Sequence, residues 1–222
     1  MKTHKSLILL AGAALLLAGC FKAPDIPVNE GPYIQMYYTG AINCEQVFLQ
    51  ESTTGPMLAF MVAGTEDEEF TAIGYGSTGD KKAFYDSLSN KHFDYGYNGE
   101  DIYANELAKR CYSKDLTSIS VVCDKDFDDE HPAGTPLDDI IAYDAYSPYP
   151  WIKEGYKGDP TFTHCLKYVK DLEPDDMKLL GCYNLFNLYF MTYPRYFTQL
   201  VFTITVATDD GMTYEIGKEV HF

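Results

Sequence analysis

Three aspartates at alternate positions could together bind a metal ion. Asp124, Asp126 and Asp128 belong to the run DKDFDDEHPAG. Carboxylates spaced in this way can converge on a hard cation, as in the first half of a calcium-binding loop. The EF-hand pattern fails, because its sixth position is Asp129 where Gly is required and its twelfth is Thr135 where Glu is required. The sequence leaves a weaker Ca²⁺ site as one prediction and a solvated loop as the alternative.

A stretch rich in aromatic residues and proline, YSPYPW, suggests recognition rather than catalysis. It contains Tyr146, Tyr149 and Trp151, with a proline before each of the last two. Exposed rings on a stiff loop suit the binding of a protein or a sugar, because they bury area at low entropic cost. The alternative is that the rings close the open end of a β-sandwich. The stretch therefore predicts either a binding surface or a plug.

Motifs typical of enzymes are weak in this chain. The run from Gly74 to Gly79 matches G-x-G-x-x-G, but Asp80 places a negative charge where a phosphate would bind. A Gly-rich turn is the favoured interpretation. The histidines accompany no G-x-S-x-G, H-E-x-x-H or papain-type pattern. Carboxylate pairs stay open because acidic residues are spread along the chain, so a carboxylate-dependent extracytoplasmic hydrolase is the alternative to a non-enzymatic binding or structural module.

The N-terminal stretch LILLAGAALLLAGC, residues 7–20, indicates where the protein resides. Its apolar run of about a dozen residues is too short to span a bilayer as a mature helix. The ending LAGC resembles the lipobox of bacterial lipoproteins, in which the cysteine is acylated and the chain is cut just before it. The resemblance implies that residues 1–19 are a signal peptide and that Cys20 carries the lipid that anchors the protein to a membrane.

The segment after this cysteine predicts a tether and an address. Residues 20–32 contain three prolines and lack apolar periodicity, which is typical of an extended linker. Phe21 stands where an aspartate would favour retention in the inner membrane of enteric bacteria. We therefore expect a cell-envelope protein in the outer membrane, with the leaflet left open, and a single β-rich domain over residues 33–222.

Charge and cysteine content narrow the partners and the compartment. With 33 acidic and 17 basic residues the formal net charge is −16, which argues against nucleic acid as a partner and leaves a protein or a glycan. Five cysteines follow Cys20, so at most two disulfides can form in an oxidising compartment. The first expectation is Cys165–Cys182, which closes a loop of about 16 residues and would stabilise the fold by roughly 3 kcal/mol. The second is Cys111–Cys123.

Periodicity predicts a mainly β protein. Apolar residues alternate along residues 117–123 and 199–207, residues 57–63 form a continuous apolar run, and Asp210-Gly211 is typical of a hairpin turn. Helices are expected over residues 80–89 and 101–112. Several short strands with turn residues between them predict an antiparallel β-sandwich, of which an immunoglobulin-like one is one form, with one or two short helices.

One segment resembles a known group of proteins. The run ISVVCDKDFDDEHPAGTPL, which begins at Ile119, is similar to a segment of a lipoprotein family from gut Bacteroidales that is classed as a domain of unknown function. The family pattern is a strand that ends in Ser/Cys-Asp-Lys-Asp-Phe/Tyr-Asp, followed by Pro-Ala-Gly and Leu-Asn/Asp-Asp. Tyr103-Ala104 and the Asp-Gly turn also fit. The resemblance implies an envelope lipoprotein and assigns no catalytic or ligand-binding residue.

Overall fold

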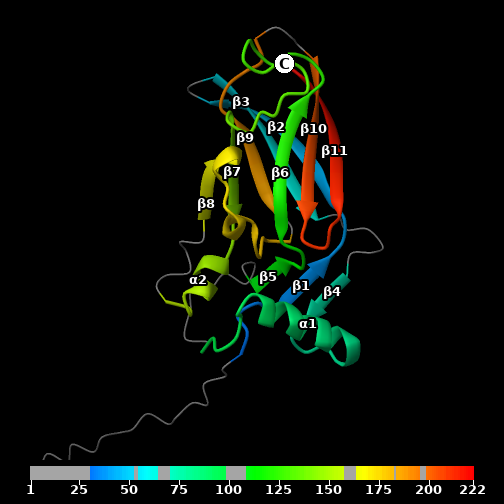
Figure 1. Cartoon of the computed structure of the whole chain (residues 1–222), viewed down its shortest axis with the longest axis vertical. Helices are drawn as coiled ribbons and strands as arrows, with labels where there is room; N and C mark the ends of the chain where they lie inside the picture. The colour runs from blue at the N-terminus through cyan, green and yellow to red at the C-terminus, as the bar shows by residue number, and fades with distance from the viewer. Residues whose placement is uncertain are drawn as a thin grey trace, which may run out of the picture.

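The described strands of this protein form three sheets, as a computed structural model shows (Figure 1). The largest has five strands in the order β2-β3-β9-β7-β8. Its strands are β2 (Ile42–Ser52), β3 (Gly55–Gly64), β9 (Phe186–Phe190), β7 (Ile141–Tyr146) and β8 (His164–Tyr168). The structure describes residues 31–52, 55–64, 71–98, 109–157, 164–182, 184–195 and 199–222.

A three-stranded sheet packs on the five-stranded one and completes a β-sandwich. Its order is β11-β10-β6, with β11 (Thr213–His221), β10 (Gln199–Thr208) and β6 (Leu116–Cys123). Phe202 of β10 meets Phe60 of β3 and Phe190 of β9 with ring centroids 5.5 and 5.0 Å apart. These contacts join the inner faces of both sheets in one hydrophobic core. The predicted fold class, a mainly β protein with a sandwich and short helices, is confirmed.

The sandwich strands follow the order of an immunoglobulin constant-type domain. When β2, β3, β6, β7, β9, β10 and β11 are lettered A to G along the chain, one sheet reads A-B-E-D and the other reads G-F-C. All of these pairings are antiparallel. Strand β8 adds an edge beside strand D. Where antibody domains carry a disulfide between strands B and F, this chain has the contact between Phe60 and Phe202.

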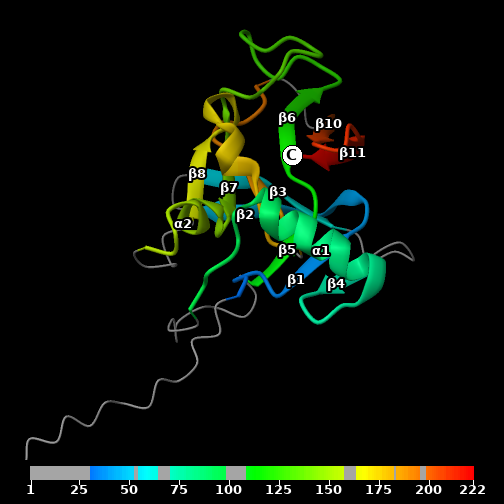
Figure 2. The same ribbon diagram turned by 60° about the horizontal axis from the view of Figure 1, so that its bottom comes forward.

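A second, smaller body of structure lies at the end of the molecule opposite the C-terminus (Figure 1), and Figure 2 turns this end toward the viewer. Here β4 (Thr71–Gly74), β1 (Met36–Thr39) and β5 (Arg110–Tyr112) form a three-stranded sheet. Helices α1 (Gly79–Lys91) and α2 (Tyr149–Lys153) lie at the same end. Two short 3₁₀ turns, η3 (Val169–Asp171) and η4 (Pro174–Met177), follow β8. None of the described helices is long and apolar enough to cross a membrane.

One expectation fails at this end. The predicted helix over residues 101–112 is wrong at its C-terminal part, because Arg110–Tyr112 is strand β5; its first part, through residue 108, lies outside the described residues. Strand β5 pairs with β1 in parallel, with Cys111 opposite Tyr37, so not every pairing is antiparallel. The helical spacing of apolar residues was overridden by this contact with a distant strand, which the local sequence cannot report.

Buried polar groups connect the elements of this end. The Asp94 carboxylate is fully buried and accepts hydrogen bonds from the backbone N–H groups of Tyr33 and Ile34, at 2.7 and 2.9 Å. The Tyr156 hydroxyl donates a third, at 2.8 Å. Burial raises the pKa of Asp94, although these hydrogen bonds oppose the rise. One side chain therefore joins the start of the described chain, the segment after α1 and the segment after α2.

Candidate functional site

In the structure, each of the three aspartates of the predicted Ca²⁺ site accepts a hydrogen bond from a backbone N–H group. The carboxylate of Asp124 accepts from the Val201 N–H at 2.8 Å, and that of Asp126 accepts from the Ala133 N–H at 2.8 Å. Asp128 accepts from the N–H of His131 at 2.9 Å and lies 2.7 Å from its imidazole. Among the described residues, no three His, Cys, Asp or Glu side chains are grouped as a metal site. We therefore carry the Ca²⁺ prediction no further.

The aromatic stretch is divided between the core and the surface. Tyr149 and Trp151, in α2, are buried, and Trp151 packs edge-on against Tyr33 with ring centroids 4.9 Å apart. Only Tyr146 is exposed, at 64%. The prediction of three rings on one binding loop is therefore wrong for Tyr149 and Trp151, which belong to a second hydrophobic core together with Tyr33 and Tyr97. The reason is that Pro148 and Pro150 begin a short helix that turns both rings inward.

The expected Cys165–Cys182 bridge is not formed in the structure. Cys165 lies on the edge strand β8, opposite Ala145. Cys182 is buried near β5. Its N–H donates to the carbonyl of Arg110 at 3.4 Å, and Arg110 is the neighbour of Cys111 in the chain. The second expectation, a Cys111–Cys123 bridge, is not formed either. Spacing along the chain favoured both pairs, but it carries no information on the strand pairings that place Cys111 in β5, Cys123 in β6 and Cys165 in β8. The predicted lipidation site, Cys20, and the tether before residue 31 lie outside the described residues.

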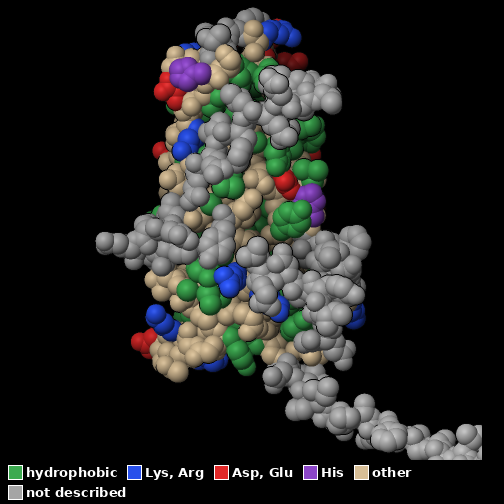
Figure 3. Space-filling model, turned by 180° about the vertical axis from the view of Figure 1, so that it is seen from behind, with side chains coloured by type: hydrophobic (Ala, Val, Ile, Leu, Met, Phe, Trp, Pro, Cys, Tyr) green, Lys and Arg blue, Asp and Glu red, His purple; other side chains and the backbone are tan. Residues whose placement is uncertain are grey.

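The strongest candidate site is a hollow on the outer face of the five-stranded sheet, with a volume of about 490 Å³. Figure 3, which views the molecule from behind, shows hydrophobic side chains gathered on this side. The outer-face hollow is lined by side chains of β7, β8, β9 and the residue after β9: Ala142, Asp144, His164, Leu166, Lys167, Tyr168, Tyr189 and Met191. Leu166 and Met191 are 61% and 57% exposed, which is unusual for side chains of this kind.

Strand register explains the shape of the hollow. Tyr189 of β9, Ala142 of β7 and Tyr168 of β8 are direct partners in one row across the sheet. Because neighbouring strands lie about 4.8 Å apart, the two tyrosines stand about 10 Å apart with a single methyl group between them. Ala142 therefore forms a low floor between two aromatic walls.

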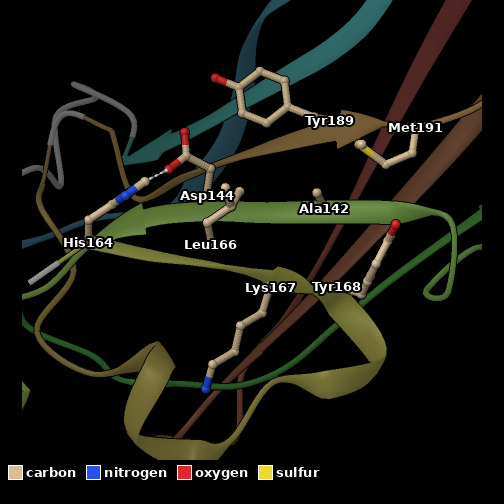
Figure 4. A pocket seen from close by; sticks show the side chains of 8 residues that line it. All are labelled: Ala142, Asp144, His164, Leu166, Lys167, Tyr168, Tyr189 and Met191. Carbon is tan, nitrogen blue, oxygen red and sulfur yellow. Dashed lines mark hydrogen bonds and ion pairs between the residues drawn. The ribbon is translucent and has the colours of Figure 1, made fainter.

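The next row across the sheet supplies the polar groups. Asp144 of β7 lies between Asn187 of β9 and Leu166 of β8. The His164 imidazole is hydrogen-bonded to the Asp144 carboxylate and stacks on the exposed Tyr146 ring, with centroids 4.7 Å apart. Figure 4 shows this Asp144–His164 pair at one end of the hollow, with Tyr168 and Met191 at the other.

The electrostatics connect the two rows. Desolvation raises the pKa of the Tyr189 hydroxyl, and the negative charge of Asp144 together with a hydrogen bond to it raises that pKa further. Tyr189 therefore stays protonated and able to donate a hydrogen bond at neutral pH. The hollow combines flat apolar surfaces with a carboxylate, an imidazole and phenolic hydroxyls that can bind polar groups of a ligand.

Most of these residues were missed by the sequence analysis. Strands β7 and β8 were not predicted, although His164, Leu166 and Tyr168 alternate with residues of the other face as strand residues do. Tyr189 lies in β9, and no local pattern in the sequence shows which face of that strand forms a site. Tyr146 is the one member of the predicted aromatic surface that lies beside the hollow, through its contact with His164.

Comparison with known proteins gives no relative. No protein-family model matches the chain, and no curated protein or solved structure does so either. The immunoglobulin-like strand order is therefore an observation on the sheets of this chain and is not supported by a matching solved structure. The resemblance to the Bacteroidales lipoprotein family stays a prediction.

Proposed function

We propose that this protein is a cell-envelope lipoprotein, anchored through Cys20, that binds an uncharged carbohydrate in the outer-face hollow. The observation that carries the proposal is the row in which Tyr189 and Tyr168 flank Ala142, with the Asp144–His164 pair at one end. An outer-membrane address and membership of the Bacteroidales family accompany the proposal; they rest on the N-terminal sequence and on the segment after Ile119.

A sugar ring suits these side chains on chemical grounds. Its C–H faces are apolar and can lie against the faces of tyrosine rings, while its hydroxyls need donors and acceptors. The Asp144 carboxylate accepts, and the Tyr189 hydroxyl donates or accepts. Asn187, the strand neighbour of Asp144, adds an amide with both functions. The volume of about 490 Å³ lies within the usual range for small-ligand sites.

The charges around the hollow favour a neutral ligand. The Lys170 ammonium lies 5.8 Å from the centre of the Tyr168 ring, so a cation would be repelled there at close range. The ammonium of Lys167 points away from the hollow and is paired with Asp176 at 2.7 Å (Figure 4). An anion would meet the Asp144 carboxylate and the field of a chain with net charge −16. Neither sign of charge is favoured.

The hydrolase alternative finds no support in this site. Hydrolysis of glycosidic bonds usually requires two carboxyl groups on opposite sides of the reacting bond. Among the described residues that line the hollow, Asp144 is the single carboxylate, and it is paired with His164. Binding without catalysis is therefore the function that these side chains support best.

The proposal is tested by affinity electrophoresis of residues 21–222 through gels that contain starch, xylan, mannan or β-glucan. We expect at least one neutral polysaccharide to retard the protein. Tyr189→Ala removes an aromatic wall and Ala142→Leu fills the floor from the outer side, so both should abolish the retardation. Tyr75→Ala, an exposed tyrosine at the other end of the molecule, serves as the matched control.

Two results would contradict the proposal. The first is migration unaffected by all four polysaccharides. The second is equal retardation of the wild type and of both hollow variants, which would place the sugar contact elsewhere. The melting temperature of each variant shows whether a loss of binding is a loss of fold, and Ala142→Leu is the safer variant because its side chain does not face the core.

A further inference from the structure

Two exposed aromatic side chains flank a buried aspartate directly after α1. Phe93 is 55% exposed and Tyr95 is 60% exposed, whereas Asp94 between them is fully buried. Large aromatic side chains usually bury most of their surface in a folded protein. This pair therefore needs a reason for its position on the surface.

The pair is held in place by hydrogen bonds on both sides. The N–H of Phe93 donates to the Asn90 carbonyl at 3.2 Å, and the N–H of Asp94 donates to the Ser89 carbonyl at 2.8 Å. The Asp94 carboxylate in turn accepts from two backbone N–H groups and the Tyr156 hydroxyl. With the residue between them fixed on both sides, the two aromatic side chains project from a rigid backbone.

The backbone of Phe93 is strained. Its φ of +60° lies in the left-handed region, at a helix C-terminus where glycine is the usual residue. A residue with a side chain pays about 1–2 kcal/mol for this conformation. More than half of the Phe93 side chain is exposed, so packing within the domain does little to offset that cost. Strain of this kind is retained at sites that act on something outside the fold.

The position of the pair suggests what that partner is. Tyr33 and Ile34, to which Asp94 is bonded, lie near the start of the described chain, and Gly31 pairs with Tyr97 through two backbone hydrogen bonds of 3.2 and 2.9 Å. The aromatic pair therefore sits where the predicted tether joins the domain, at the end opposite the C-terminus (Figure 1). The eleven Cα–Cα steps from Cys20 to Gly31 can span at most about 40 Å.

We infer that Phe93 and Tyr95 contact the surface of the membrane to which Cys20 anchors the chain. The inference rests on the proposed lipid anchor and concerns a surface distinct from the outer-face hollow. Aromatic side chains favour the boundary between headgroups and acyl chains, because their apolar bodies leave water while their polar atoms remain hydrated. Two such rings add to the membrane affinity of the lipid and fix the orientation of the domain.

The charge of the neighbouring helix is compatible with this contact. Helix α1 carries three basic side chains, Lys81, Lys82 and Lys91, and two acidic ones, Asp80 and Asp86. Lys82 is paired with Asp86, and Lys91 is paired with Asp115 and Asp209 of other segments. The helix itself therefore adds no excess of negative charge that would repel anionic headgroups.

Fluorescence quenching in vesicles tests the inference. The full acylated chain with Tyr95→Trp is purified from membranes and reconstituted on phosphatidylethanolamine–phosphatidylglycerol vesicles with brominated acyl chains. We expect the emission at position 95 to be quenched and shifted to the blue, relative to wild type with its buried Trp151 as background. Phe93→Trp provides a second probe in case the first variant folds poorly. Tyr193→Trp is the control, because Tyr193 contacts Phe222 at the far end.

The outcomes separate the inference from the proposal beneath it. Quenching at position 95 or 93 that exceeds quenching at position 193 supports the contact. An acylated chain in which all three positions are quenched equally weakly overturns the inference alone. An intact mass that lacks the acyl groups overturns the lipid anchor and the inference with it, while leaving the carbohydrate site to its own test.

Discussion

The two hydrophobic cores of this molecule are built from different materials. The sandwich core consists mainly of aliphatic and phenylalanine side chains, most of them from strands, and includes the two buried tyrosines Tyr112 and Tyr143. The core near α1 is rich in tyrosine and includes buried polar groups, of which Asp94, His92 and Asp115 are the clearest. His92 links the carbonyl of Leu88, at 2.9 Å, to the carboxylate of Asp115, at 3.0 Å.

The difference shows that the part of the molecule that supplies most of the stability is not the part that holds exposed aromatic side chains in place. Burial of apolar area is spread over many side chains, so the sandwich can carry an open hollow on its outer face without losing its core. Near α1, a few hydrogen-bonded groups hold segments that are far apart in sequence, and each loss would leave a buried polar group without its partner. That end can hold Phe93 and Tyr95 rigidly on the surface, but it depends on single residues.

The largest expected effect is in the sandwich core. Phe202→Ala should lower the free energy of unfolding by about 3–5 kcal/mol, because a fully buried ring that contacts Phe60 and Phe190 is replaced by a cavity. Urea denaturation followed by circular dichroism measures the change. Val201→Ala, one residue away and 37% exposed, should change stability by less than about 0.5 kcal/mol. Equal losses for the two variants would show that the sandwich core is not where stability resides.

A local effect of intermediate size is expected near α1. Asp94→Asn leaves an amide group facing two backbone N–H donors and should cost about 1–3 kcal/mol. Hydrogen exchange should show lost protection at Tyr33 and Ile34, with the amides of β10 unchanged. Glu130→Gln, an exposed acid, is the control and should leave both regions protected. Loss of protection throughout the sandwich would mean that the two cores unfold as one unit.

A gain in stability is expected when the strained backbone conformation of Phe93 is relieved. Phe93→Gly should raise the free energy of unfolding by about 1 kcal/mol, since glycine adopts a φ of +60° without steric cost. The matched control is Phe84→Gly, an exposed residue within α1, which should lower stability by about 1 kcal/mol. A destabilised Phe93→Gly protein would show that the ring packs within the fold and is not held out for a partner.

The smallest effect concerns a surface turn of the sandwich. Burial opposes ionisation of Asp210, but hydrogen bonds from the Thr208 hydroxyl and the Met212 N–H, with the charge of Lys114, lower its pKa to about 2. Since its unfolded pKa is about 3.9, its contribution is complete above that pH and is lost as the pH falls through about 2.

Comparison of the wild type with Asp210→Asn at two pH values measures how much this exposed carboxylate contributes to stability. The side chain of Asp210 is 41% exposed, so the free energy of unfolding of the wild type should exceed that of Asp210→Asn by less than about 1 kcal/mol at pH 7, and the difference should vanish about one pH unit below the folded pKa. Melting temperatures at the two pH values give the comparison. A difference that persists at the lower pH would mean that the turn is stabilised by the shape of the side chain and not by its charge.

The sequence predicted the part of the fold that depends on local alternation. Leu200, Phe202, Ile204 and Val206 share a buried face of β10, as expected from their spacing. The candidate site could not be predicted in this way. Ala142, Tyr168 and Tyr189 come together only through the pairing of β7, β8 and β9, and no local pattern encodes that pairing.

In the core near α1, the partners of the buried polar residues could not be predicted from local sequence patterns either. The carboxylate of Asp94 finds the N–H groups of Tyr33 and Ile34 about 60 positions away, at distances of 2.7 and 2.9 Å. Tyr149 and Trp151, which were predicted to be exposed, are core residues because they contact residues far away in the sequence: Tyr149 contacts His92, and Trp151 contacts Tyr33. A local reading of the aromatic stretch could therefore identify the rings but not the side of the fold on which they lie.

The most direct test of the central claim is an NMR titration of ¹⁵N-labelled residues 21–222 with oligosaccharides prepared from whichever polysaccharide retards the protein. The account predicts chemical-shift changes concentrated on β7, β8 and β9 around Ala142, with the amides of β6, β10 and β11 unaffected. Changes confined to another part of the surface, or no changes at saturating sugar, would contradict the assignment of the outer-face hollow as the binding site.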